Sequence, residues 1–544
     1  MAAESPGPAP SGIIESRLNA PAVQDLHRRV GRGGALSLDG VASPAQPFVA
    51  ALLHRLFPRR PLLVVTDGLK AQEQFQQDLE TWLRRERQHG QQPGEASTRT
   101  LFFPDWEILP HEDKLPHLDV IADRLRTVMA LLNGSPTGSD SRPEQPPIIT
   151  NVIALTQRTF VPSRLRSRIK RLARGQNMDP LDLVEWLEDQ GYEPEVQVDS
   201  PGQIALRGGI VDVYPPSSPW PVRLEFFGNE LESLREFDPH TQISRDEIAS
   251  VEFPPAGEFA LLRREAGHGK PEAAASDAAR DRTGFATLLD YLPDNTLVLL
   301  CEPERLAEHA AHYAESMPEQ HPLFLEWSAL VSAMHGRGMT VAAVTEGTDE
   351  LSGLADEPPF DESNGNSPLS GAKGALPVLP CGSLDLYRPL GERMPDPQVA
   401  EAQRRDFFQQ MQRWLRQGYA VQVFCNNDGE RQRFEEVWRE QSGSGILPDT
   451  GDGETSAAED KLGRTPTSDK RPAAPAKRGP ASTVKAQNTR TTTLADARGD
   501  RQDACPTLRL GSLSRGFIIE PLRLVVVTDA EIFGRYKIQR PRRL

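Results

Sequence analysis

The sequence predicts an α/β protein: a parallel-sheet domain covered by helices, an inserted small antiparallel α+β domain, and a second small α/β domain after it. Two patterns lead to this prediction. Short apolar runs alternate with helical patterns between residues 22 and 135, which is typical of parallel strands connected through helices. Between residues 207 and 238, apolar and polar residues instead alternate with a period of two, as in a half-buried antiparallel sheet.

The parallel-sheet domain begins with short apolar runs, which predict buried strands, and with apolar residues spaced three or four apart, which predict helices. The strands are expected at residues 35–38, 61–66, 101–103 and 148–154, and the helices at residues 47–57, 69–83 and 119–132. Further along the chain the alternation of helices and buried strands resumes, with a helix at 285–292 and a buried strand at 296–301.

The antiparallel domain is entered through a basic segment, residues 163–173, that has helical spacing. One strand is expected from Arg207 to the Pro-rich turn after Tyr214, and a second at residues 222–227. A turn at Gly228-Asn229 then leads into a third strand, residues 231–238.

The last domain is expected to hold a helix at 398–416, a strand at 419–425, a helix capped by Asp428 that runs to Trp438, and a strand at 522–528. The resulting division is a flexible start (1–21), the first segment of the parallel-sheet domain (22–155), the inserted domain (156–246), the second segment (247–344), a spacer (345–396), the last domain (397–440 and 506–538) and a disordered insertion (441–505).

Composition limits the class of protein. A chain of 544 residues is too long for one core, and its 48 Pro and 42 Gly with only 38% hydrophobic residues indicate unfolded segments. The net charge of −15 argues against a chain that coats nucleic acid. Four widely spaced cysteines, no signal peptide and no long apolar run predict a cytoplasmic protein without a metal site, and we expect a monomer.

A loop at the position of a phosphate loop lacks the residues that hold a nucleotide. Gly40 begins the loop after the first strand, but Ala45, Gln46 and Pro47 stand where a working loop has Gly, Lys and Ser or Thr. Without the cation and the magnesium ligand, the sequence predicts a degenerate phosphate loop in a nucleotide-binding fold.

Two groups of cations allow alternative interpretations. The basic segment contains Arg164, Arg168, Lys170 and Arg171, which form either a solvated face of an amphipathic helix or a contact surface for nucleic acid or an acidic partner. In the antiparallel domain, Arg207, Arg223 and Arg235 either pair with Asp212, Glu225 or Glu232, or anchor a partner on a docking face. The residue types alone do not decide between these interpretations.

Several motifs in a fixed order carry a family resemblance. They are Phe103-Pro-Asp-Trp-Glu-Ile-Leu-Pro110, Leu206-Arg-Gly-Gly-Ile-Val-Asp-Val-Tyr-Pro215, Arg223-Leu-Glu-Phe-Phe-Gly-Asn-Glu230 and Val527-Thr-Asp-Ala-Glu-Ile-Phe-Gly-Arg535. With them the chain resembles the amino-terminal, UvrB-like region of the bacterial transcription-repair-coupling factors (Mfd).

The resemblance implies that the inserted domain docks UvrA, the damage-scanning ATPase of nucleotide excision repair, through Arg207, Arg223, Phe227 and Arg235. It also implies that RNA polymerase, DNA, ATP and magnesium belong to later family domains that follow this region, so the chain is expected to be a fragment or a split gene product without catalytic residues or a cofactor of its own. The alternatives are a DNA-stimulated ATPase or helicase, a UvrB-type damaged-DNA-binding protein, or a DNA binder that uses residues 163–174 and the basic tail.

Overall fold

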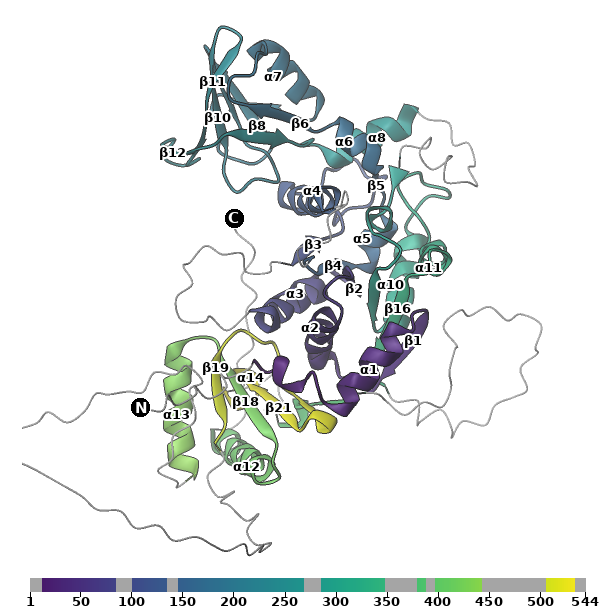
Figure 1. The fold of residues 1–544 in the computed structure, drawn as a ribbon, viewed down its shortest axis with the longest axis vertical. Coiled ribbons are helices and arrows are strands. Elements are labelled where there is room, and N and C mark those ends of the chain that lie inside the picture. The colour runs from purple at the N-terminus through teal and green to yellow at the C-terminus, as the bar shows by residue number, and fades with distance from the viewer. Residues whose placement is uncertain are drawn as a thin grey trace, which may run out of the picture.

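The computed structural model describes residues 12–84, 100–134, 145–268, 285–347, 379–387, 397–442 and 505–533. Within these residues the strands form two six-stranded sheets, one five-stranded sheet and two two-stranded ribbons. The antiparallel domain stands at one end of the molecule, the parallel sheet lies in the middle, and the five-stranded sheet lies at the other end (Figure 1). The predicted mixed α/β fold with a parallel and an antiparallel sheet is therefore confirmed.

The central sheet is parallel throughout. Its strand order is β1 (Ala35–Asp39), β16 (Thr340–Thr345), β15 (Leu297–Cys301), β2 (Leu62–Thr66), β4 (Ile148–Asn151) and β3 (Leu101–Phe103). Every residue of β2 and β15 is buried, because both faces of the sheet are covered. Successive residues of these strands alternate between two cores, which explains the continuous apolar runs in the sequence.

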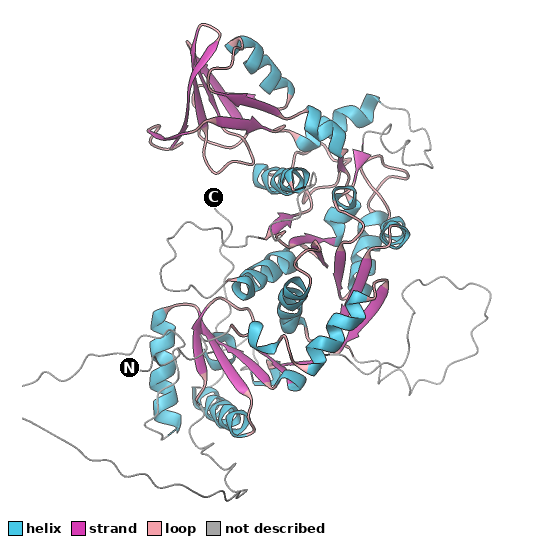
Figure 2. Ribbon diagram, in the orientation of Figure 1, coloured by secondary structure: helices cyan, strands magenta, loops and turns pink. Residues whose placement is uncertain are grey.

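Helices cover both faces of this sheet (Figure 2). One core holds the inward residues of α1 (Pro21–Gly31), α2 (Gln46–Leu56) and α3 (Leu69–Leu83). The other core holds those of α4 (Leu118–Asn133), α5 (Val152–Thr156), α8 (Glu258–His268), α10 (Pro303–Glu315) and α11 (Trp327–Gly336). The predicted helices at 47–57, 69–83 and 119–132 thus lie where their apolar spacing requires them.

The inserted domain is a sheet with one helix on it. Its strand order is β12 (Ser244–Glu247), β11 (Glu230–Phe237), β10 (Val222–Phe227), β9 (Ile210–Val213), β8 (Gln203–Arg207) and β7 (Glu193–Pro194). All neighbours are antiparallel except β7 and β8. Helix α7 (Pro180–Asp189) packs on one face through Leu183 and Leu187. A ribbon of β6 (Lys170–Ala173) and β13 (Ser250–Phe253) carries the chain into and out of this domain.

The five-stranded sheet packs against the central domain with one face and carries its own helices on the other. Its strand order is β17 (Cys381–Ser383), β20 (Phe517–Ile519), β21 (Leu524–Thr528), β18 (Ala420–Cys425) and β19 (Thr507–Leu510). Helices α12 (Pro397–Arg416) and α13 (Asp428–Ser442) cover the outer face. On the inner face, Phe424 and Phe517 join Phe48 of α2 and Trp82 of α3 in one aromatic cluster, with ring centroids 5.0–6.0 Å apart.

Several predicted elements are wrong in part. The basic helix stops early: α6 (Pro162–Ser167) is short, and the chain then becomes strand β6, because β13 offers it a pairing partner and a core position for Leu172. Residues 285–292 form β14 (Phe285–Ala286) and the 3-10 turn η3 (Leu288–Tyr291) instead of a helix, since β14 pairs with β5 (Thr159–Phe160).

Two smaller differences concern strand and helix ends, and a third concerns the start of the chain. The strand expected at 148–154 ends at Asn151, whose side chain caps α5. Asn427, and not Asp428, caps α13 by accepting a hydrogen bond from the Glu430 N–H. In the segment expected to be flexible, Ile14 is buried in the first core. The insertion expected to be disordered lies almost entirely outside the described residues, and the basic tail, residues 535–544, lies entirely outside them.

Candidate functional site

The inserted domain presents one sheet face that α7 does not cover, and its polar residues lie in register. We call it the arginine face and define it by six side chains: Arg207, Asp212, Arg223, Glu225, Phe227 and Arg235. Asp212 of β9 lies opposite Arg223 of β10, which lies opposite Arg235 of β11. These residues therefore point to the same side of the sheet, away from the core beneath α7.

A two-residue turn that the sequence analysis missed builds this face. Arg207 ends β8, and Gly208-Gly209 leads directly into β9, so the strand expected from Arg207 to Tyr214 is two strands joined by a hairpin. Gly208 has a φ of +63°, which favours glycine. A Cβ on Gly209 would lie 2.8 Å from the Phe226 carbonyl oxygen, so the close approach to β10 also requires glycine.

Asp212 is the centre of the polar contacts on the face. The Arg207 Nη2 donates to Asp212 Oδ2 at 2.6 Å, while Arg223 donates from Nε to Oδ1 at 2.7 Å and from Nη2 to Oδ2 at 2.9 Å. The Asp212 side chain has no exposed area, whereas the Arg223 side chain is 17% and the Arg207 side chain 48% exposed. Of the interpretations left open for these two arginines, pairing with Asp212 is therefore present in the structure.

The pairing of the two arginines with Asp212 leaves part of the arginine face accessible to a partner. The Arg223 guanidinium lies over the Phe237 ring, 4.6 Å from its centroid, and its hydrogen bonds to Asp212 raise its pKa. Arg207 is held at one end only and keeps half of its surface in solvent. Phe227 stands at the end of β10 and is 79% exposed, an unusual degree of exposure for an aromatic side chain. Arg207 and Phe227 are thus the accessible members of the arginine face.

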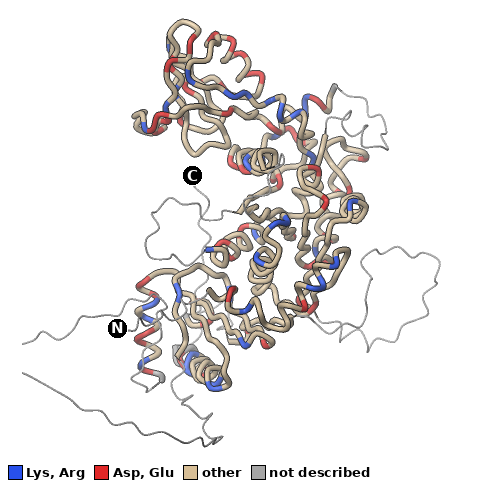
Figure 3. The backbone as a smooth tube through the Cα atoms, in the orientation of Figure 1, with Lys and Arg blue, Asp and Glu red and all other residues tan. Residues whose placement is uncertain are grey.

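The basic segment is already engaged within the chain. Arg164 and Arg168 both contact the carboxylate of Glu265 in α8, at 3.1 and 2.6 Å. The Lys170 ammonium lies 4.3 Å from the Trp186 ring centroid, and Arg171 donates to the Ser250 hydroxyl. This segment braces the inserted domain against α8. Along the described chain, acidic and basic residues are interspersed (Figure 3).

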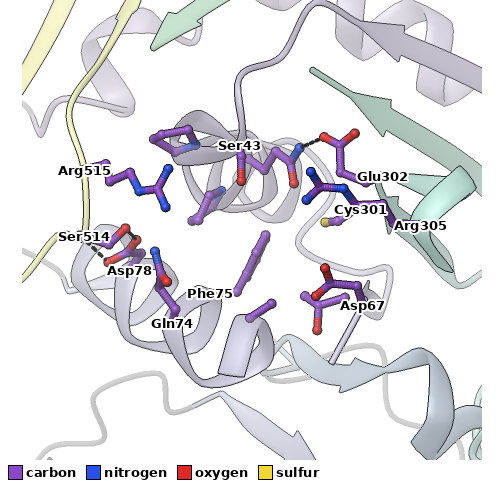
Figure 4. A pocket seen from close by; sticks show the side chains of 15 residues that line it. Ser43, Asp67, Gln74, Phe75, Asp78, Cys301, Glu302, Arg305, Ser514 and Arg515 are labelled. Atoms are coloured by element: carbon purple, nitrogen blue, oxygen red, sulfur yellow. Dashed lines mark hydrogen bonds between the residues drawn. The ribbon is translucent and has the colours of Figure 1, made fainter. Parts of the chain in front are cut away.

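At the position of the phosphate loop, an internal carboxylate faces the start of α2. Gly40 has a φ of +72°, and Ala45, Gln46 and Pro47 are buried. The Gln46 side-chain N–H donates to Glu302 Oε1 at 2.7 Å (Figure 4). Burial raises the pKa of the Glu302 carboxyl, and the same carboxylate also accepts from the Glu346 N–H.

Beside this contact lies a cavity of about 190 Å³ between the central domain and the five-stranded sheet. Its charged lining has both signs, from Asp67, Asp78, Glu302, Arg305 and Arg515 (Figure 4). Asp78 accepts hydrogen bonds from the Ser514 backbone N–H and hydroxyl, which ties α3 to the five-stranded sheet. Among the described residues, no group of three or more His, Cys, Asp or Glu side chains is arranged to hold a metal ion.

A buried ion pair lies at the base of the inserted domain, and the residue types alone did not predict it. The Arg124 guanidinium lies between the Phe103 and Trp106 rings, 4.1 and 4.7 Å from their centroids, and its Nε donates to Glu258 Oε2 at 2.9 Å. Both charged side chains are fully buried. The Phe103-Pro-Asp-Trp motif thus serves to hold a buried ion pair.

Comparisons with known proteins agree with this architecture. Residues 171–259, from β6 into α8, match the family model of the UvrB interaction domain. The chain is 30% identical over 370 residues to the transcription-repair-coupling factor of Mycobacterium bovis, an alignment that covers 61% of this chain and 28% of the relative. It is 26% identical over 312 residues to that of Bacillus subtilis, covering 50% and 24%, and 35% identical over 155 residues to that of Escherichia coli, covering 28% and 13%.

The chain is therefore a mixed α/β protein in which a region similar to the UvrB interaction domain is inserted between two segments of a parallel-sheet domain. The resemblance indicated by the sequence motifs is confirmed: over about 60% of its length the chain is related to the transcription-repair-coupling factors. It spans less than a third of the length of these relatives. No helix among the described residues is long and apolar enough to cross a membrane.

Proposed function

We propose that this chain recruits UvrA in transcription-coupled nucleotide excision repair, and that the arginine face is the docking surface. The observation that carries the proposal is that Arg207 and Phe227 are both exposed on one sheet, in the region that matches the UvrB interaction domain. Arginine and aromatic side chains dominate the energy of protein interfaces, because each combines a large contact area with directional interactions. The recruited UvrA acts at RNA polymerase stalled at a DNA lesion, in the bacterial cytoplasm.

The central domain, in this proposal, is a nucleotide-binding scaffold that has lost its nucleotide. Gln46 replaces the phosphate-binding lysine, and the Glu302 carboxylate 2.7 Å away adds a negative charge where phosphates would need a positive one. Its role is then to hold the inserted domain. Polymerase contact and ATP-driven DNA translocation are activities of the family that we assign to no residue described here.

Substitutions on the arginine face test the docking surface. We expect Arg207→Glu and Phe227→Ala each to weaken UvrA binding by about tenfold or more, since a hot-spot side chain contributes about 2 kcal/mol or more. Leu181→Ala is the matched control, because Leu181 is 65% exposed in the same domain but lies on α7, at the other face. Titration calorimetry with purified UvrA measures all three. Equal affinities of the three variants would place the docking surface elsewhere.

Nucleotide binding is a separate test. Calorimetry with ATP and magnesium is expected to give no binding heat for this chain, because the loop at Gln46 offers no cation and faces Glu302. Tight binding would favour the alternative function, a DNA-stimulated ATPase. The control is Glu302→Gln, which removes the opposing charge but restores no phosphate-binding lysine, and we expect it to stay silent as well.

A further inference from the structure

The arginine face has an unusual charge arrangement at its centre. One carboxylate, that of Asp212, is fully buried and contacts two guanidiniums, at 2.6 Å for Arg207 and at 2.7 and 2.9 Å for Arg223. A third arginine, Arg235, lies next to Arg223 in the strand register. Three cations on one face of a sheet, in β8, β10 and β11, repel one another unless an anion holds them. Asp212 is the anion that lies between two of the three.

The two guanidiniums that contact Asp212 have different surroundings. Arg223 makes a two-point contact with the carboxylate, lies over the Phe237 ring and is 17% exposed. Its guanidinium is therefore packed into the sheet and offers little surface to a partner. Arg207 makes a one-point contact and is 48% exposed. Arg223 fixes the orientation of the carboxylate, and the carboxylate then fixes one nitrogen of Arg207. The other edge of the Arg207 guanidinium stays accessible to a partner.

We propose that Asp212 is a positioning residue of the docking face, whose buried carboxylate holds the Arg207 guanidinium in the orientation that captures a carboxylate of UvrA. This inference rests on the docking function proposed above. A guanidinium held in one rotamer binds a carboxylate at two points without first losing side-chain entropy. Asp212 itself does not touch the partner, since it has no exposed surface.

The proposal predicts an effect that charge alone would not produce. Asp212→Asn keeps the size of the side chain and makes the face more positive by one charge. If the face acted only through its net charge, an acidic partner would associate faster and bind more tightly. If Asp212 positions Arg207, the variant binds more weakly, because an amide N–H in place of one carboxylate oxygen faces the N–H groups of the guanidiniums and releases Arg207.

Association and dissociation rates of the whole chain with immobilised UvrA provide the test. For Asp212→Asn we expect the dissociation rate to rise at least tenfold while the association rate stays the same or increases, since loss of a buried charged contact acts mainly on dissociation. Val211→Ala is the matched control: Val211 is the neighbouring residue, buried on the α7 side of the same strand. A general loss of folded protein lowers the binding-competent fraction in both variants without changing the dissociation rate.

The outcomes separate the inference from the function on which it rests. If Arg207→Glu weakens binding and Asp212→Asn leaves the dissociation rate unchanged or lowers it, the positioning role is wrong and the docking face stands. If Arg207→Glu and Phe227→Ala also bind as the unmodified chain does, the docking face itself is wrong. A faster dissociation of Asp212→Asn that Val211→Ala does not share supports the proposal.

Discussion

Replacing Arg124 by methionine is expected to lower the free energy of unfolding by about 3–5 kcal/mol, the usual loss when one partner of a buried ion pair is removed. Arg124 and Glu258 are both fully buried, and the guanidinium fills the space between the Phe103 and Trp106 rings. Methionine keeps most of the apolar volume but leaves the Glu258 carboxylate without its cation. Thr159 would then be its remaining side-chain donor among the contacts described here.

Chemical denaturation measures this loss, and Arg126→Met is the matched control. Arg126 lies two residues further along α4 and pairs with Asp123 in a contact that reaches solvent, where such a pair contributes about 0–1 kcal/mol. The double variant Arg124→Met with Glu258→Leu should recover part of the stability, because no unpaired charge remains in the core. If Arg124→Met cost no more than Arg126→Met, the buried pair would have no structural importance.

This buried pair lies where the central domain meets the inserted domain. Arg124 belongs to α4 of the central domain, and Glu258 begins α8, where the chain leaves the UvrB interaction domain. Arg164 and Arg168 contact Glu265, about two turns further along α8. These ion pairs thus hold α8 at the point where the chain passes from the inserted domain into the central domain.

The parallel sheet could be predicted because the sequence of each strand and helix shows which of its sides are buried. Strands covered on both faces must be apolar throughout, as in β2 and β15, and the helices between them must be apolar on one side. The wrong predictions have a non-local cause. Residues 170–173 became a strand because residues 250–253, about eighty positions away in the chain, pair with them. Helical spacing in a short segment does not reveal such a partner.

The sequence pointed to several residues of the arginine face, but not to its geometry. Arg207, Arg223 and Phe227 follow from the motifs, since they match the residues that give the chain its family resemblance. The central role of Asp212 depends on the turn at Gly208-Gly209, which places Arg207 beside it across two strands. Likewise, a count of cations could not show that side chains of the basic segment contact Glu265 and Trp186, because these two residues lie in other elements.

Trp82→Ala is expected to separate the five-stranded sheet from the central domain and to cost about 3–5 kcal/mol, the usual loss for removing a buried aromatic side chain. Trp82 belongs to α3 of the central domain, yet its ring lies 5.2 Å from Phe424 and 6.0 Å from Phe517 of the other sheet. One core continues across this junction, so we expect the two parts to unfold together in the unmodified chain.

Hydrogen exchange during denaturation, followed separately in β2 and in β21, distinguishes a lost junction from a general loss of stability. In Trp82→Ala, β21 should become exchangeable at a lower denaturant concentration than β2, because the hydrogen bonds between the two parts, among them those of Asp78 with Ser514 and of Cys381 with Gly40 and Ala42, do not replace the lost aromatic contacts. Trp438→Ala is the matched control, since Trp438 is equally well buried but packs on Phe434 inside the last domain. Coincident exchange of both strands in Trp82→Ala would mean that the aromatic cluster does not couple the two domains.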